Sequence, residues 1–146
     1  MPVNPQDPIP RKDHISVSYL VSRLRERVHI NIDACVSDNC AGDRYVVEAD
    51  LHRPGLALAG YINLFTYQRI QIIGNTETQF LGNMGTDKQL ESFRNITQFE
   101  IPVIFLTDGN QLPEHLLNAA KEAGIPVYST PYETTRFMYL LRDFLE

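Results

Sequence analysis

The chain has 146 residues, enough for one domain that buries about 68–70% of the surface its unfolded chain exposes. A hydrophobic content of 43% and a charged content of 21% are typical of a globular protein and argue against disorder throughout. The formal net charge of −5 argues against nucleic acid as a partner, and no stretch reaches the ~20 apolar residues of a membrane-spanning helix.

Residues 1–14 carry four prolines and no periodic apolar pattern. We therefore expect an extended or disordered lead-in there, followed by a domain over residues 15–146. The first residues also lack the basic and then apolar pattern of a secretory signal. This start predicts a cytoplasmic protein with no membrane partner.

A helix is predicted from Ser16 onward, because four apolar side chains follow it at helical spacing; they are Val17, Leu20, Val21 and Leu24. The other side of this helix carries the basic stretch Arg23, Arg25 and Arg27, which we expect to face solvent. Apolar and polar residues then alternate over 28–32, a pattern typical of a strand. Cys35 and Cys40 follow in a polar loop, where they could form a disulfide, stay free thiols or supply half of a metal site. We expect free thiols, and a closed zinc site would need four ligands although no second Cys/His pair has zinc spacing.

The middle of the chain is predicted to alternate strands and helices. A strand over 45–49 ends at Asp50, and a helical turn over 56–61 follows the break at Pro54-Gly55. Residues 70–73 form the next strand, which Gly74 stops. Capping-box patterns at residues 76–79 and 86–89 then predict the starts of two helices.

The C-terminal part continues the alternation. A continuous apolar run over 102–106 predicts a strand covered on both faces, and Pro113 and Gly124 frame the helix after it. A last strand over 125–129 precedes a closing helix that a third capping box opens at residues 130–133. The whole pattern predicts an α/β fold with a mostly parallel sheet of about five strands and helices on both faces.

Polar residues and glycines occupy the predicted carboxyl ends of the strands, where ligands of parallel sheets collect. The candidate binding residues are Arg53, Gly55, Asn75, Thr76, Glu77, Thr107, Asp108, Ser129 and Thr130. Arg53 beside a Pro-Gly turn can offer bidentate donors to an anion, or it can form a salt bridge to Glu77 or Asp50. We expect a small-anion or nucleotide-like pocket around Arg53 and Glu77, while His52 is interpreted as a structural hydrogen-bonding group.

The sequence lacks the common catalytic motifs. Its three lysines, Lys12, Lys88 and Lys121, follow Arg, Asp and Ala, so there is no Gly-Lys pair to hold a nucleotide β-phosphate. G-x-G, G-x-S-x-G and H-E-x-x-H are also missing. We therefore predict no catalytic residue, no metal site and no cofactor in this chain.

One run is far more specific than these single motifs. It reads His-Arg-Pro-Gly-Leu-Ala-Leu-Ala-Gly-Tyr over residues 52–61, followed by Arg-Ile-Gln-Ile-Ile-Gly over 69–74 and then by Glu77. Together with residues 15–21, 101–107 and 124–130, it resembles the N-terminal domain of the HPr kinase/phosphorylases. Those enzymes phosphorylate and dephosphorylate a serine of the sugar-transport phosphocarrier HPr.

The resemblance implies an α/β domain similar in layout to the N-terminal domains of Mur ligases, serving regulation or assembly beside a kinase core. It also implies that ATP and magnesium bind in a separate catalytic domain, whose phosphate-loop residues have no counterpart in this chain. HPr would be the partner of the full-length enzyme, and a homo-oligomer is expected. The role implied for the enzyme is carbon catabolite regulation through the phosphotransferase system.

Two other functions stay open. A receiver domain would use Asp50 as the phosphoacceptor, with Pro54, Thr107 and Pro131 in supporting positions. Against this, Thr130 stands where that class needs a lysine, and the strand ending at Ile32-Asp33 lacks the acidic pair that binds magnesium. The third possibility is a scaffold module in which the strand-end residues serve only as caps.

Overall fold

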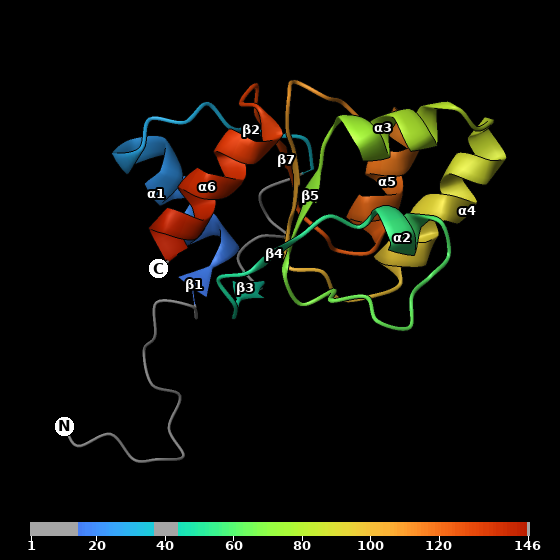
Figure 1. Cartoon of the computed structure of the whole chain (residues 1–146), viewed down its shortest axis with the longest axis horizontal. Helices are drawn as coiled ribbons and strands as arrows, with labels where there is room; N and C mark the ends of the chain where they lie inside the picture. Colours follow the sequence, from blue (N-terminus) through green and yellow to red (C-terminus); the bar gives the residue numbers. More distant parts are fainter. Residues whose placement is uncertain (1–14, 37–43, 146) are drawn as a thin grey trace, which may run out of the picture.

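The computed structural model describes residues 15–36 and 44–145 (Figure 1). The predicted lead-in over 1–14 and Cys40 lie outside the described residues. Cys35 is a partly exposed free thiol. The longest helices in these two ranges have 12 residues, and none of the helices described could cross a membrane.

A five-stranded sheet forms the centre of the fold, with the strand order β2-β7-β6-β5-β4. Its strands are β2 (Asp33–Ala34), β4 (Leu51–His52), β5 (Ile70–Ile73), β6 (Ile104–Leu106) and β7 (Val127–Ser129). The last four run parallel to one another, and β2 pairs antiparallel with β7. The predicted α/β class with a mostly parallel sheet of about five strands is confirmed.

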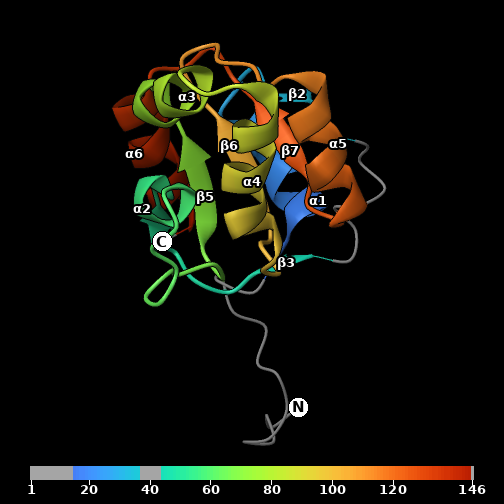
Figure 2. The same ribbon diagram turned by 90° about the vertical axis from the view of Figure 1, so that its right-hand side faces the viewer.

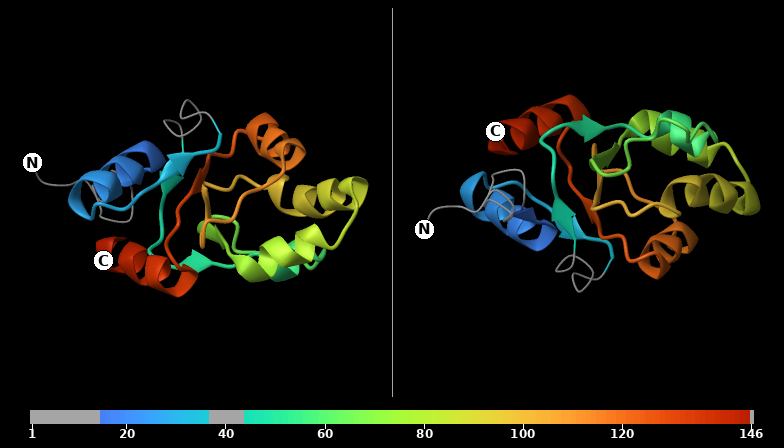
Figure 3. Two further views of the ribbon diagram at one scale, coloured as in Figure 1. Left: turned by 90° about the horizontal axis from the view of Figure 1, so that it is seen from above. Right: turned by 90° about the horizontal axis from the view of Figure 1, so that it is seen from below.

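Helices cover both faces of this sheet (Figure 3). One face carries α2 (Gly55–Leu58), α3 (Asn75–Gly82), α4 (Thr86–Thr97) and α5 (Glu114–Glu122), and the other carries α1 (Val17–Arg27) and α6 (Thr134–Leu145). The parallel strands follow one another in chain order across the sheet. Right-handed crossovers between strands added in one direction must all lie on the same face, which places α2 to α5 together.

The core has two parts, one on each face of the sheet. Alternate strand residues supply them: Ile73, Leu106 and Val127 pack toward α2 to α5, whereas Ile72, Phe105 and Tyr128 pack toward α1 and α6. All of these side chains are at most 1% exposed. Because both faces are covered, the strands are apolar throughout rather than alternating, as the run over 102–106 predicts.

The strand predicted over residues 28–32 is wrong. Val28 ends helix α1, and His29 adopts a left-handed conformation with φ of +58°, which interrupts an extended chain. The backbone N–H of Ile30 donates to the Leu24 carbonyl, and the Arg25 guanidinium donates to the Ile32 carbonyl. Pairing therefore starts only at β2, although Ile30 and Ile32 are buried as the alternation predicts.

The strand predicted over 45–49 is mostly wrong as well. Only β3 (Tyr45–Val46) is extended and paired, and its partner is β1 (Ile15–Ser16) in a separate two-stranded antiparallel sheet. Asp50 is followed by β4, one of the two edge strands of the main sheet, and does not end a strand of that sheet. Sequence periodicity identifies extended segments but not their partners, because pairing depends on residues far away in the chain.

The helix starts are shifted from the predicted capping boxes. Helices α3 and α4 follow the N-cap residues Gly74 and Gly85. The third box is displaced further, since α6 starts at Thr134. The Glu133 carboxylate accepts hydrogen bonds from the backbone N–H groups of Thr135 and Arg136. At α1 the prediction holds, because the Ser16 hydroxyl accepts from the Tyr19 N–H at 3.2 Å.

Candidate functional site

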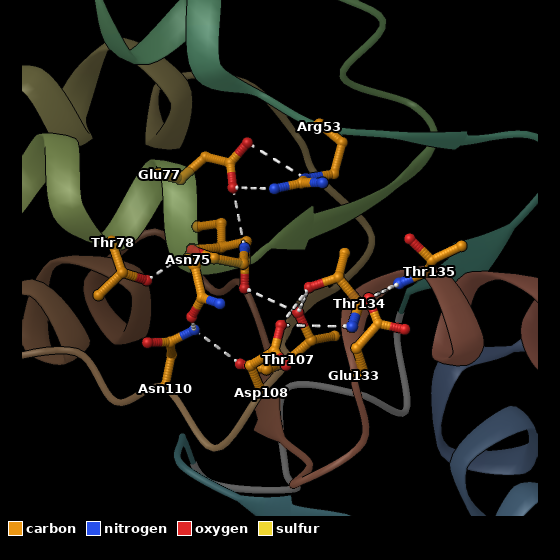
Figure 4. Close-up of polar contacts among 12 residues, drawn as sticks. Arg53, Asn75, Glu77, Thr78, Thr107, Asp108, Asn110, Glu133, Thr134 and Thr135 are labelled. Carbon is orange, nitrogen blue, oxygen red and sulfur yellow. Dashed lines mark hydrogen bonds and ion pairs between the residues drawn. The ribbon is translucent and has the colours of Figure 1, made fainter.

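The carboxyl ends of β4, β5 and β6 meet at one edge of the sheet, where Arg53 faces Glu77 (Figure 4). Arg53 donates from Nε to Glu77 Oε2 at 3.2 Å and from Nη2 to Oε1 at 2.8 Å. Glu77 is only 4% exposed, whereas the Arg53 side chain is 36% exposed. A bidentate pair of this kind is both strong and geometrically specific. The salt bridge to Glu77, one of the alternatives expected for Arg53, is therefore formed.

Glu77 also fixes the start of α3. Its Oε1 accepts the backbone N–H of Gly74 at 2.9 Å, so one buried carboxylate satisfies a free helix donor and the arginine together. Gly74 is tightly surrounded, since a Cβ atom there would lie 2.6 Å from Thr134 Oγ1 and 3.1 Å from Arg53 Nη2. This position admits only glycine without a shift of its neighbours.

A second group of polar side chains joins the end of β6 to the start of α6. Thr134 Oγ1 donates to Asp108 Oδ2 at 2.7 Å and lies 2.6 Å from Thr107 Oγ1. Because Thr134 has one hydroxyl hydrogen, Thr107 is the donor in the second contact. Thr107 is fully buried and Thr134 is 6% exposed, so the chain of hydroxyls ends on a partly buried carboxylate.

Asp108 is held in an uncommon backbone conformation, with φ of +57°. Its N–H donates to the carbonyl of Tyr132, and the N–H of Gly109 donates to Thr130. The two loops that follow β6 and β7 are thereby tied together at the backbone. Asn110 extends the same network by donating to Asn75 Oδ1 at 2.9 Å and to the Thr107 carbonyl at 2.8 Å.

The predicted site residues fall into two groups. The network brings together five of them, namely Arg53, Asn75, Glu77, Thr107 and Asp108. Gly55 lies beside the network, since a Cβ atom added at this residue would be 3.8 Å from Glu77 Oε2. Thr76 is exposed on the first turn of α3. Ser129 and Thr130 line a separate polar pocket, together with Asn31, Asp33, Gly109 and Gln111. The small-anion pocket around Arg53 and Glu77 stays a prediction.

Thr134 and Asn110 are not among the binding residues predicted from the sequence. Both act through hydrogen bonds to residues 26 and 35 positions away, respectively. A signal for Asn110 was present, because Thr-Asp-Gly-Asn directly after a buried strand is a turn pattern whose Asn can bond its own backbone. No comparable local signal marks Thr134, which the displaced start of α6 brings into the network.

His52 lies next to this site and packs on Phe65, with ring centroids 5.6 Å apart. Burial lowers the pKa of His52 below its ordinary value of 6.5, the charge of Arg69 lowers it further, and the charge of Glu77 opposes both. The ring is therefore neutral near pH 7. It lines an open pocket of about 320 Å³, whose wall includes Leu56, Tyr61 and Leu64.

The strands do not place Asp50 and Thr107 close together, as a receiver domain requires. Asp50 precedes β4 and lies level with Arg69, whereas Thr107 follows β6 and lies level with Gly74. At a rise of about 3.3 Å per residue, these two levels are about 16 Å apart along the sheet. Asp50 is instead exposed and forms ion pairs with Arg69 and Arg142.

Comparison with known proteins gives one consistent family. The sequence model described as the HPr Serine kinase N terminus matches residues 15–145. An HPr kinase/phosphorylase of Chloroherpeton thalassium is 45% identical over 136 residues, which are 93% of this chain and 40% of the relative. One from Chlorobium limicola is 52% identical over 103 residues, which are 70% of this chain and 31% of the relative. The chain thus spans less than half the length of the curated relatives it matches.

A solved structure supports the fold. The CBS and DRTGG domains of the regulatory region of Clostridium perfringens pyrophosphatase, complexed with diadenosine tetraphosphate, match with a TM-score of 0.58 and 12% identity. The match covers 88% of this chain and 46% of that one. At this identity the likeness concerns the fold alone. The family model over almost the whole described chain is decisive, and the chain belongs to the HPr serine kinase N-terminal domain family.

Proposed function

We propose that this chain acts as a non-catalytic, regulatory or assembly domain of an HPr kinase/phosphorylase. One observation carries the proposal: Arg53, the best candidate for a phosphate contact, is held at two points by the nearly buried Glu77. A phosphate group at this place would have to compete with a carboxylate for the same donors. The strand-end residues are thus arranged to hold loops together rather than to transfer a phosphoryl group.

Phosphoryl transfer needs a group that neutralises and orients the transferred phosphate. A phosphate loop does this with backbone N–H groups and a lysine, and the 146 residues contain no Gly-Lys pair. In this proposal ATP and magnesium bind elsewhere in the full-length enzyme, which is also the part that meets the serine of HPr. The setting we infer is cytoplasmic carbon catabolite regulation through the phosphotransferase system, with a homo-oligomeric enzyme.

A chimeric enzyme tests this role. The matching N-terminal segment of the Chloroherpeton thalassium HPr kinase/phosphorylase is exchanged for residues 15–145 of this chain and compared with an enzyme that lacks the segment. We expect the chimera to regain the oligomeric state of the intact relative and its balance of HPr phosphorylation and dephosphorylation. If the chimera and the shortened enzyme behave identically in assembly and in both reactions, the proposal is wrong.

A further inference from the structure

The polar pocket beyond the end of β7 is separate from the Arg53–Glu77 pair. Its volume is about 410 Å³, and its wall includes Asn31, Asp33, Gly109, Gln111, Ser129 and Thr130. This volume lies in the lower part of the range of about 300–1,000 Å³ found for small-ligand pockets. We propose that this pocket binds an uncharged, hydroxyl-rich ligand of the sugar or polyol class. The proposal goes beyond the function above and does not depend on it.

Strand pairing brings the two sides of the pocket together. Asp33 is the register partner of Ser129 in the antiparallel β2–β7 pair, so the two side chains lie next to each other on the same face of the sheet. Two further lining residues, Gly109 and Gln111, belong to the loop between β6 and α5. Figure 2 shows β2, β6, β7 and α5 in this part of the fold. The backbone bond from Gly109 to Thr130 fixes this loop against the end of β7.

Two hydroxyl groups of the wall keep hydrogen-bonding capacity for a ligand. Ser129 is 5% exposed, and its hydroxyl makes no hydrogen bond to any part of the chain that the structure describes. Because Ser129 lines the pocket, this hydroxyl can donate to or accept from a ligand there. Thr130 is 1% exposed and accepts a long bond of 3.4 Å from the Tyr132 N–H, which leaves its own hydrogen free to be donated.

The chemistry of the wall selects the ligand class. Two amides, two hydroxyls and one carboxylate supply both donors and acceptors, and the lining residues that the structure describes include no Lys, Arg or His. A phosphate would meet the carboxylate of Asp33 with no cation among these described residues to balance it. A nucleobase would find no aromatic ring among them to stack on. A sugar hydroxyl both donates and accepts, so it matches this mixed set of groups.

The experiment is a titration of the purified ¹⁵N-labelled chain, followed by the backbone amide signals in two-dimensional NMR. The probes are D-glucose and maltose, with glucose 6-phosphate and inorganic phosphate as charged comparisons. We expect at least one neutral sugar to shift the signals of Asp33, Gly109 and Ser129 in a saturable way, with weaker shifts from its charged counterparts.

Two variants separate binding at this pocket from binding elsewhere. Asp33→Asn should weaken sugar binding about tenfold, because a charge-assisted hydrogen bond becomes a neutral one. Asp87→Asn removes the same charge from an exposed position on α4 and should leave the affinity unchanged. The proposal is overturned if neither sugar shifts these signals, if phosphate binds more tightly than glucose, or if Asp33→Asn binds as the unmodified chain does.

Discussion

Arg53 and Glu77, which lie 24 residues apart in the chain, form a two-point ion pair that joins the end of β4 to the first turn of α3. Glu77 is nearly buried and Arg53 reaches solvent on one side. The carboxylate could not be buried at low cost without this partner, since an unpaired buried charge is strongly destabilising. We therefore expect the pair to contribute mainly to the stability of the strand ends.

Replacing Arg53 with Ala should lower the free energy of unfolding by about 2 kcal/mol, because Glu77 keeps only its bond to the Gly74 N–H. Urea denaturation measures this loss. The control is Arg94→Ala on the exposed face of α4, where we expect a change within about 0.5 kcal/mol. Glu77→Gln should lower the free energy of unfolding less in the Arg53→Ala variant than in the unmodified chain. Equal effects at the two arginines would contradict this account of the pair.

Gly74→Ala should destabilise the fold by about 1–3 kcal/mol, since its Cβ would stand 2.6 Å from Thr134 Oγ1 and force the network apart. Gly82→Ala is the matched control, because a Cβ there meets nothing within 4 Å and alanine favours the helix. Thermal unfolding of both variants is the measurement. If Gly74→Ala leaves the stability unchanged, or if Gly82→Ala lowers it equally, the close approach at Gly74 does not determine the stability of the fold.

Asp108 combines a left-handed backbone with two hydrogen bonds to Thr134. We expect stability to fall in the order Asp, Asn, Gly, Ala at this position. Asn keeps an acceptor and tolerates this backbone, Gly loses the acceptor but not the backbone freedom, and Ala loses both. The difference between Gly and Ala should be about 1 kcal/mol in urea denaturation. If Ala is as stable as Gly, the backbone at residue 108 is not constrained as described.

His52 should make stability depend on pH. Its pKa is lowered in the folded chain, so below about pH 6.5 the unfolded chain binds more protons than the folded one. The free energy of unfolding should therefore fall as pH drops through the window between 6.5 and the lower folded pKa. His52→Phe keeps the contact with Phe65 but cannot titrate, and it should lose less stability between about pH 7.5 and about pH 5.5 than the unmodified chain. Parallel pH curves for the two proteins would contradict the lowered pKa.

Local patterns in the sequence predicted most of the fold. The apolar run over 102–106 indicated a strand with both faces covered, and the helical stripe after Ser16 indicated α1; both are present. The strand predicted over 28–32 failed because His29 turns the chain with a positive φ that alternation cannot reveal. Pairing of β3 with β1, instead of with the main sheet, is likewise decided by contacts distant in sequence.

The site was predictable to the extent that it follows from strand ends. Arg53, Glu77 and Asp108 were expected at one edge because parallel strands end together, and the structure brings them there. Thr134 was not expected, because its role depends on where α6 starts relative to a loop 26 residues earlier. Ser129 was predicted only as one of the candidate binding residues at the strand ends, and its neighbour Asp33 on the antiparallel strand β2 could not be read from the local pattern.

The most direct measurement is an assay of phosphotransfer by the purified chain with ATP, magnesium and HPr, followed by detection of phosphoserine. The intact Chloroherpeton thalassium HPr kinase/phosphorylase in the same mixture is the positive control. We predict no phosphoserine from the chain alone, because Arg53, the best candidate for a phosphate contact at the strand ends, is already bound to a carboxylate. Transfer of phosphate to HPr by these 146 residues would contradict the account.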